Sequence, residues 1–216
     1  MWTGAWRLPA LPGLLLLCLL LLCLLLLCLR PAPAHAAEDF RIEASAQNGA
    51  VVLHVQARLH ARMGAIWSTL TDYEKLPQFV PCIRVSRVLE RRGPLAVVEQ
   101  KGAAQVLFFS YPIEVTVESV EKLHESISVR VLKGNLRQLE GGYKLTRVDG
   151  REDEYILTWR GIIEPDFDVP SLISVPLMRA SLKDQFLAMI AEIERREAAL
   201  EAARPATAEA KTAAGG

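Results

Sequence analysis

The most constraining feature of this sequence is a long series of alternating segments followed by one long helical segment. From residue 84 to residue 165, apolar and polar side chains alternate in runs that short turns separate. This alternation is typical of an antiparallel meander with one solvated face. After Ser174, the expected N-cap, one helical stripe comprises Met178, Leu182, Phe186, Met189, Ile190 and Ile193. Because a sheet with one apolar face needs a cover, we expect it to curve around this helix in an α+β fold.

Before the meander, the sequence predicts a hairpin, a long strand and a short helix. Asn48-Gly49 between two alternating runs is a strong signal for a two-residue hairpin turn. Every second residue from 51 to 59 is apolar, as in a strand with one buried face. Helical spacing then covers residues 63–70. With this short helical break after the first main strand, the order of elements corresponds to a helix-grip arrangement.

The segment TDYEKLPQFVPCI connects the short helix to the meander. Thr71 and Glu74 match a capping box that would start a second short helix. Pro77 is expected to end that helix, because a proline steers the residue before it out of the α region. Capping leaves Tyr73 and Phe79 without a structural role, so we expect both rings at the rim of a cavity.

The first 36 residues are typical of an export signal. Leu14–Leu29 contains only Leu and Cys, and the small residues that end at Ala36 fit a cleavage site, so cleavage is predicted after Ala36. The alternative is an uncleaved membrane anchor formed by residues 11–29. Either way, we expect export to the periplasm or cell envelope. A ligand-binding domain is expected over residues 37–200 and a disordered tail over residues 201–216.

Composition limits the chemistry of the exported part. It retains 23 basic and 25 acidic residues, so no basic excess is available for a nucleic-acid surface. Cys82 is its only cysteine, which excludes an internal disulfide and favours a small buried apolar side chain. Its three histidines, His54, His60 and His124, match no metal-site spacing, so no metal site is expected. No other cofactor is expected either.

Two acidic residues are candidates for proton transfer. Glu99, on the phase set by Val97, would share a face with an apolar neighbour and line a cavity; an exposed edge position is the alternative. Asp166 belongs to the acidic cluster 164–168 before the long helix, where solvated charges near a helix N-terminus are the alternative. Gly141-Gly142 lies within a predicted strand, which indicates a bulge or a close backbone approach.

Four stretches of this sequence resemble one protein family. They are IWSTLTDYEKLPQFVPCIRVSRVLE, VEQKGAAQVLFFSYPIEV, EGGYKLTRVDG and the C-terminal stretch that contains LMRASLKDQFLAMIAEIERR. Over about residues 50–197 they resemble the START-like (SRPBCC) superfamily, in particular its polyketide cyclase/dehydrase and coenzyme Q-binding group. The resemblance implies a helix-grip fold with a hydrophobic cavity between the sheet and the C-terminal helix. It also implies binding of a lipid, a quinone or a polyketide-like compound.

The candidate ligand-binding residues come from three parts of the chain. By resemblance, the helical segment beside the cavity entrance contributes Trp67, Leu70, Tyr73 and Phe79. By the same resemblance, the helical lid contributes Met178, Leu182 and Phe186. The alternating segments contribute side chains that should converge on the same space: Tyr111, Val115, Tyr143 and Trp159.

Three functions remain open from the sequence. The leading hypothesis is a monomeric, non-catalytic carrier or chaperone of a hydrophobic small molecule, with peripheral or N-terminal membrane association. The first alternative is a cyclase- or dehydrase-type enzyme in which cavity acids transfer protons. The second alternative is a cell-envelope interaction protein whose own side chains fill the cavity.

Overall fold

A computed structural model describes residues 39–106, 109–166 and 170–213. The chain divides into two compact units, Met1–His35 and Ala36–Gly216. The predicted export signal and the alternative anchor lie outside the described residues. Within the described ranges, no helix is both long enough and apolar enough to cross a membrane.

The second unit is built on one antiparallel sheet of eight strands, in the spatial order β1-β2-β8-β7-β6-β5-β4-β3. The strands are β1 (Arg41–Gln47), β2 (Ala50–His60), β3 (Ile83–Arg92), β4 (Leu95–Val106), β5 (Phe109–Lys122), β6 (Ser126–Gly134), β7 (Leu136–Arg147) and β8 (Glu154–Pro165). The helices are α2 (Met63–Thr71), η2 (Tyr73–Lys75), α3 (Leu76–Phe79) and α4 (Ser171–Ala213). The predicted meander therefore runs from β3 to β8, and β8 pairs with β2 to join it to the first hairpin.

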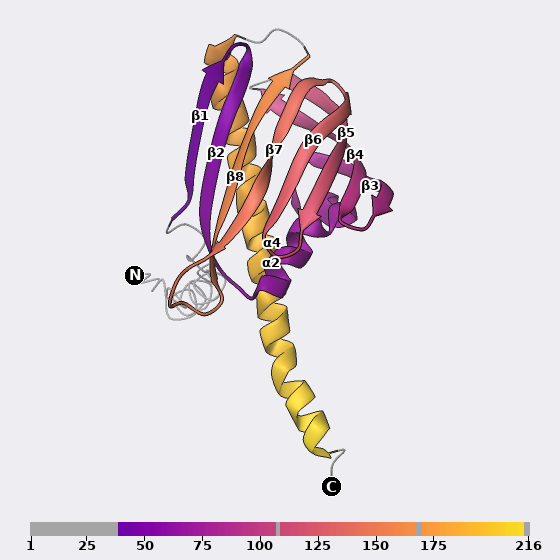
Figure 1. Ribbon diagram of the computed structural model, residues 1–216, viewed down its shortest axis with the longest axis vertical. Helices are drawn as coiled ribbons and strands as arrows, with labels where there is room; N and C mark the ends of the chain where they lie inside the picture. The colour runs from indigo at the N-terminus through magenta and orange to yellow at the C-terminus, as the bar shows by residue number, and fades with distance from the viewer. Residues whose placement is uncertain (1–38, 107–108, 167–169, 214–216) are drawn as a thin grey trace, which may run out of the picture. The chain divides into compact units, whose positions relative to one another are not determined.

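The long helix α4 lies along one face of this sheet, as Figure 1 shows. Its predicted apolar stripe is buried against the sheet at Leu182, Phe186, Met189, Ile190 and Ile193. The opposing apolar residues of β2 are buried as the alternation predicts: Val51, Leu53, Val55, Ala57 and Leu59. The α+β helix-grip prediction is thus confirmed, because the one long amphipathic helix does cover the apolar face of the curved sheet.

Two glycine predictions are also confirmed. Asn48 and Gly49 form the turn between β1 and β2 with positive φ angles of 51° and 87°, as a two-residue hairpin requires. Gly141 and Gly142 lie within β7 without a register shift between them. A Cβ atom at either position would lie 2.5 Å from a carbonyl oxygen of a neighbouring strand. The reason for these glycines is therefore close backbone approach, not a bulge.

The helical break differs from its prediction in two details. The Thr71 hydroxyl donates to the carbonyl of Trp67 over 2.8 Å, one turn back within α2, and caps no second helix. Leu76 is helical, with φ −48° and ψ −40°, and Pro77 lies in the first turn of α3. The capping box and the stop at Pro77 are therefore wrong, because a proline is compatible with the start of a helix.

Helix α4 is longer than predicted at both ends. It begins at Ser171, and the backbone N–H groups of Ile173 and Ser174 both donate to the carbonyl of Pro170. Ser174 is therefore inside the first turn and is not the N-cap. At the other end α4 continues to Ala213, through most of the segment 201–216 expected to be disordered. Alanine, which is common in that segment, has the highest helix propensity.

Candidate functional site

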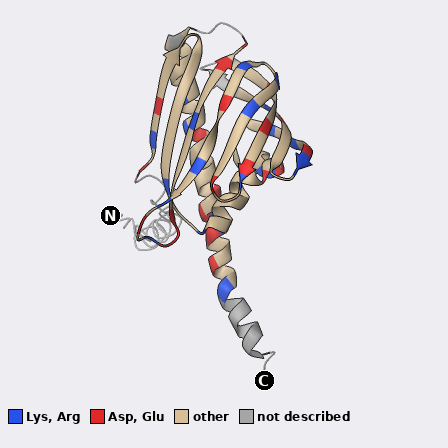
Figure 2. Cartoon of the chain, in the orientation of Figure 1, with Lys and Arg blue, Asp and Glu red and all other residues tan. Residues whose placement is uncertain are grey.

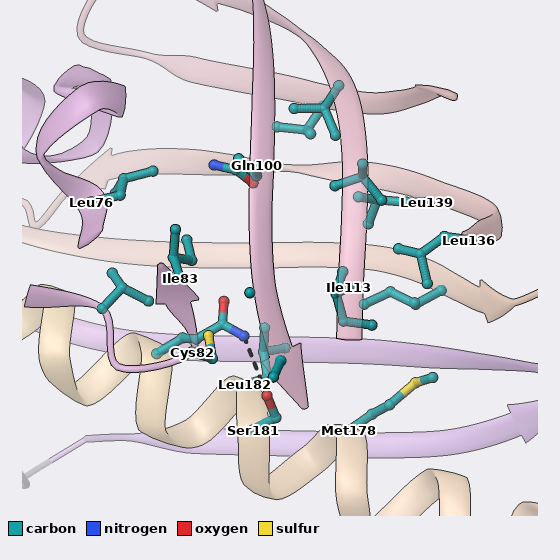
Figure 3. A pocket seen from close by; sticks show the side chains of 18 of the residues that line it. Leu76, Cys82, Ile83, Gln100, Ile113, Leu136, Leu139, Met178, Ser181 and Leu182 are labelled. Carbon is teal, nitrogen blue, oxygen red and sulfur yellow. Dashed lines mark hydrogen bonds between the residues drawn. The ribbon is translucent and has the colours of Figure 1, made fainter. Parts of the chain in front are cut away.

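The central feature of the second unit is a cavity of about 460 Å³ between the sheet and α4. Figure 3 shows apolar side chains of the helical break, the strands and α4 around it. The helical break contributes Leu70, Tyr73, Leu76 and Val80, and α4 contributes Met178, Leu182 and Met189 among others. The strands contribute Val98, Ile113, Val115, Val117, Val129, Leu136, Leu139, Tyr143, Trp159 and Ile163. The wall is therefore mostly hydrophobic, which is typical of a small-molecule site.

The structure brings eight of the eleven candidate ligand-binding residues to this wall. They are Leu70, Tyr73, Tyr111, Val115, Tyr143, Trp159, Met178 and Leu182. Their convergence follows from strand alternation and from the helical stripe, since each element turns one face inward. Contact of these residues with a ligand stays a prediction.

The other three candidates pack elsewhere. Phe186 is fully buried in the core, with its ring centroid 5.8 Å from that of Tyr143 and 6.4 Å from that of Phe40. The Trp67 ring meets His124 edge-on at 5.6 Å. The Phe79 ring lies 5.9 Å from the guanidinium carbon of Arg196. Of the three rings, Phe186 contacts a wall residue, Tyr143, whereas Trp67 and Phe79 contact residues outside the wall.

The sequence interpretation missed several wall residues. Ile83, Leu136 and Leu139 line the cavity (Figure 3), and their apolar character gave too weak a signal to separate cavity wall from filled core. Polar wall residues were missed as well, because polar side chains are expected to face solvent: Gln100 and Ser119 in the strands, and Ser181 and Gln185 in α4.

Neither candidate acid lines the cavity. The wall residues of β4 include Val98 and Gln100, so Glu99 between them points to the other face of the sheet, where it lies 4.0 Å from Lys101. Asp166 accepts a hydrogen bond from the Tyr111 hydroxyl over 3.1 Å in an exposed position. Among the wall residues that the structure describes there is no Asp, Glu or His.

Three titratable groups of the wall, Cys82, Tyr73 and Tyr143, are held in their neutral forms. Burial raises the pKa of the Cys82 thiol. Burial is also the main cause of the raised pKa of Tyr143, and for Tyr73 the neighbouring Glu121 adds to it. Both tyrosines and the thiol therefore stay protonated near neutral pH. They can donate or accept hydrogen bonds, but they are poor general bases.

A close backbone approach fixes Cys82 against β4. The Ala103 N–H donates to the carbonyl of Cys82 over 3.0 Å. A Cβ atom added to the neighbouring Gly102 would lie only 1.9 Å from that same carbonyl oxygen. Glycine is thus required at this position for the segment before β3 to close over the cavity wall.

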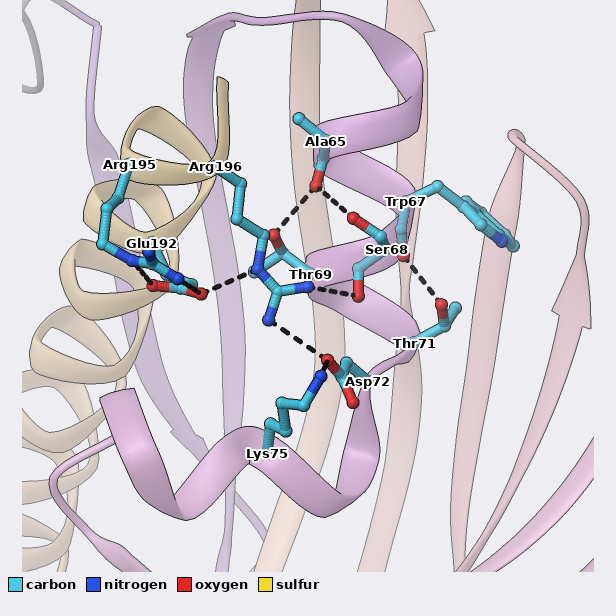
Figure 4. A network of polar contacts seen from close by, with 10 residues as sticks. All are labelled: Ala65, Trp67, Ser68, Thr69, Thr71, Asp72, Lys75, Glu192, Arg195 and Arg196. Atoms are coloured by element: carbon cyan, nitrogen blue, oxygen red, sulfur yellow. Dashed lines mark hydrogen bonds and ion pairs between the residues drawn. The ribbon is translucent and has the colours of Figure 1, made fainter. Parts of the chain in front are cut away.

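A polar network holds the helical break against α4. Arg196 contacts Glu192 over 2.7 Å, the carbonyl of Ser68 over 3.0 Å and Asp72 over 3.2 Å. Figure 4 shows its guanidinium between α4 and the end of α2. Glu192 is buried, and the hydrogen-bonded Arg195, with Arg196 in support, lowers the pKa of Glu192 to about 2. This network positions the wall residues that precede β3.

A metal site and a match to a curated protein would each bear on the function of this chain. No group of three or more potential metal ligands occurs in the described ranges. No curated protein matches the chain.

Solved structures show which known proteins share this fold. A START superfamily protein from Mycobacterium smegmatis is 17% identical, with a TM-score of 0.57 over 67% of this chain and 97% of that chain. A STAR-related lipid transfer protein from Xanthomonas axonopodis is 16% identical, with a TM-score of 0.59 over 74% of this chain and 97% of the other. The aromatase/cyclase Zhui from a Streptomyces species is 14% identical, with a TM-score of 0.52 over 73% and 96%. At these identities the likeness concerns the fold alone.

The sequence itself matches a family model. The model is described as polyketide cyclase/dehydrase and lipid transport, and it matches residues 59–190, from the end of β2 through the cavity-lining part of α4. The match spans more than half of the chain and includes the helical break and the meander. The chain therefore belongs to the polyketide cyclase/dehydrase and lipid transport family.

Proposed function

We propose that this protein is an exported, non-catalytic carrier or chaperone that shelters a hydrophobic small molecule in the cavity between the sheet and α4. The observation that carries the proposal is the cavity of about 460 Å³ with its mostly apolar wall. Its size lies within the range of roughly 300–1,000 Å³ that is usual for small-molecule sites. Apolar surface buried there would contribute roughly 25 cal/mol per Å² to binding.

The chemistry of the wall favours a carrier over an enzyme. The cyclase or dehydrase alternative needs an acid or base that reaches into the cavity. Glu99 and Asp166 lie outside, and the described wall holds neither a carboxylate nor an imidazole. The second alternative, an interaction protein with a filled cavity, requires side chains in the space that is open here.

Export rests on the sequence of the first 36 residues. The apolar run Leu14–Leu29 and the small residues that end at Ala36 support a cleaved leader. Because only Cys82 follows the leader, the exported chain would depend on its hydrophobic core even in an oxidising compartment.

Native mass spectrometry of the full chain, expressed with its leader and purified from the cell envelope, tests both parts of the proposal. We expect the protein to carry a noncovalently bound hydrophobic molecule and to begin at Ala37. An intact mass with residues 1–36 retained would contradict cleavage. Protein that carries no such molecule and takes up none from a lipid extract would contradict the carrier function.

A further inference from the structure

At the cavity wall, uncharged polar side chains face the cavity, whereas the one charged side chain among the described wall residues points to the other face of the sheet. Gln100 and Gly102 of β4 face the cavity, so the side chain of Lys101 between them leaves on the opposite face. There its Nζ lies 3.3 Å from Glu114 and 4.0 Å from Glu99. Lys101 is the only charged residue among the described residues that border the cavity. Its charge is thus directed away from the interior and is already paired.

Figure 2 shows that both signs of charge are spread over the strands and α4. The pairing of Lys101 is one case of this pattern, since the strand partner of Lys101 in β5 is Glu114. Charged residues therefore neutralise one another on the solvent side of the sheet. Among the described residues that line the cavity, no unpaired cationic side chain points into it.

The polar groups that do face the cavity are neutral. Tyr143 approaches from β7 and packs its ring at 5.8 Å against Phe186, next to Gln185 on α4. The Gln185 amide donates a long hydrogen bond of 3.4 Å to the Ser181 hydroxyl, one turn earlier. Figure 3 shows this hydrogen bond at the cavity, with Cys82 and Gln100 in the same wall.

Two of these groups have unused hydrogen-bonding capacity. Among the described residues, neither the Tyr143 hydroxyl nor the Gln100 amide has a side-chain or backbone partner. Both can bond to a ligand oxygen without breaking an existing contact. Buried polar groups normally find partners, and a ligand with a neutral oxygen would supply them here.

A charged head group would be unfavourable in the same place. An anion moved into this wall would lose its hydration, and no cation would face it. An uncompensated buried charge costs far more free energy than a neutral carbonyl or hydroxyl that forms hydrogen bonds. The cavity therefore discriminates by head-group charge as well as by hydrophobicity.

We propose that the cavity selects uncharged amphiphiles, such as long-chain ketones, alcohols or esters, and excludes molecules whose carboxylate or phosphate would have to enter it. This inference rests on the proposed carrier function. The neutral oxygen of the ligand bonds to the Tyr143 hydroxyl, and its apolar chain occupies the rest of the cavity.

Isothermal titration of the purified protein with decane, 2-decanone and decanoate tests this selectivity. At about pH 7.5, where decanoate is ionised, we expect 2-decanone to bind at least about tenfold more tightly than decanoate. At about pH 4, where much of the acid is neutral, decanoate should regain affinity. Decanoate that binds as tightly as 2-decanone at about pH 7.5 would overturn the inference and leave the carrier function intact. If none of the three compounds binds, the carrier function fails as well.

Variants locate the head group. Tyr143→Phe should weaken binding of 2-decanone about fivefold to tenfold and leave binding of decane unchanged, because only a hydrogen bond is removed. Gln100→Lys should raise the affinity for decanoate relative to 2-decanone, while the control Lys144→Met, at an exposed position of β7 outside the cavity wall, should not change that ratio. If Gln100→Lys does not fold, the effect of Tyr143→Phe on binding of 2-decanone tests the position of the ligand oxygen by itself. Unchanged binding of 2-decanone to Tyr143→Phe would contradict the proposed position of its oxygen.

Discussion

Tyr73 of η2 donates a hydrogen bond to Glu121 of β5, with 2.9 Å between the phenol oxygen and the carboxylate. The two residues are 48 positions apart, and Arg91 of β3 holds the same carboxylate at 3.0 Å. The Tyr73 ring lines the cavity, so this contact ties the helical break to the sheet at the cavity wall. The break is therefore positioned from the sheet through Tyr73 as well as from α4 through Arg196.

Replacement of Tyr73 by phenylalanine should lower the free energy of unfolding by about 1.5 kcal/mol, because Glu121 loses a buried donor. The ring and the wall remain, so the cavity keeps its apolar surface. Urea unfolding measures the change, and Tyr111→Phe, which removes the exposed hydrogen bond to Asp166, is the matched control with an expected loss below about 0.5 kcal/mol. Equal losses in the two variants would show that the Tyr73 contact has no special role.

Tyr73 also predicts how stability changes in alkali. Burial and Glu121 raise the pKa of Tyr73 above its ordinary value of about 10. The unfolded chain then releases this proton first, so stability should fall as the pH rises above about 10. Tyr73→Phe lacks this phenol, so its free energy of unfolding should fall less above about pH 10 than that of the wild type. An identical alkaline decline in both proteins would contradict the prediction.

Two adjacent arginines of α4 contact Glu192 but should differ in their contribution to stability. Arg196 also reaches Ser68 and Asp72, and its side chain is 17% exposed, whereas that of Arg195 is 68% exposed. A lysine at position 196 cannot form all three of these contacts at once, so Arg196→Lys should lower the free energy of unfolding by about 2 kcal/mol. Arg195→Lys should cost less than about 1 kcal/mol. The reverse order in thermal or urea unfolding would refute the role assigned to Arg196.

Glu192 should make the fold sensitive to acid. Its pKa of about 2 lies below the value of about 4.3 expected in the unfolded chain, mainly because Arg195 donates to it. The stabilising effect is complete above the unfolded value and is lost as the pH falls from about 4.5 to about 2. Glu192→Gln should be less stable by about 2 kcal/mol at neutral pH, and this difference should shrink in acid. The exposed Glu74→Gln serves as the control, and a pH-independent difference for Glu192→Gln would contradict the assignment.

Glycine at position 102 is required by the carbonyl of Cys82. Gly102→Ala would place a Cβ atom 1.9 Å from that oxygen, so the backbone must shift at the cavity wall. We expect a loss of more than about 3 kcal/mol in the free energy of unfolding. Gly64→Ala is the control, since Gly64 lies in α2 with no atom within 4 Å of the added carbon. It should be neutral or stabilise the fold by up to about 0.5 kcal/mol. A Gly102→Ala protein as stable as Gly64→Ala would refute the steric argument.

Much of the fold follows from periodicity in the sequence. The alternation from Val51 to Leu59 and the stripe from Leu182 to Ile193 identify the buried faces of β2 and α4, and the structure confirms both. Helix ends were less predictable. Leu76 is helical although it precedes a proline, and Pro77 lies in a first helical turn, where proline is tolerated. Helix α4 begins at Ser171, earlier than its apolar stripe indicates.

The candidate site was predictable only in part, since periodicity identifies an inward face but not an empty space. Phe186 and Leu182 share the stripe of α4, yet Phe186 fills the core while Leu182 borders the cavity. Val97 and Val98 are adjacent apolar residues, so the phase of β4 was ambiguous and Glu99 was placed on the wrong face in one of the two alternatives. Such choices depend on contacts between distant segments.

The central claim is that the space between the sheet and α4 binds an apolar molecule. Its most direct test is titration with the uncharged fluorescent dye N-phenyl-1-naphthylamine. Ser181→Trp fills the cavity from α4, and Lys183→Trp places the same side chain on the exposed face of that helix. We predict saturable binding to the wild type and to Lys183→Trp, and binding at least about tenfold weaker to a folded Ser181→Trp protein. Equal binding to all three proteins, or no binding to the wild type, would contradict the claim.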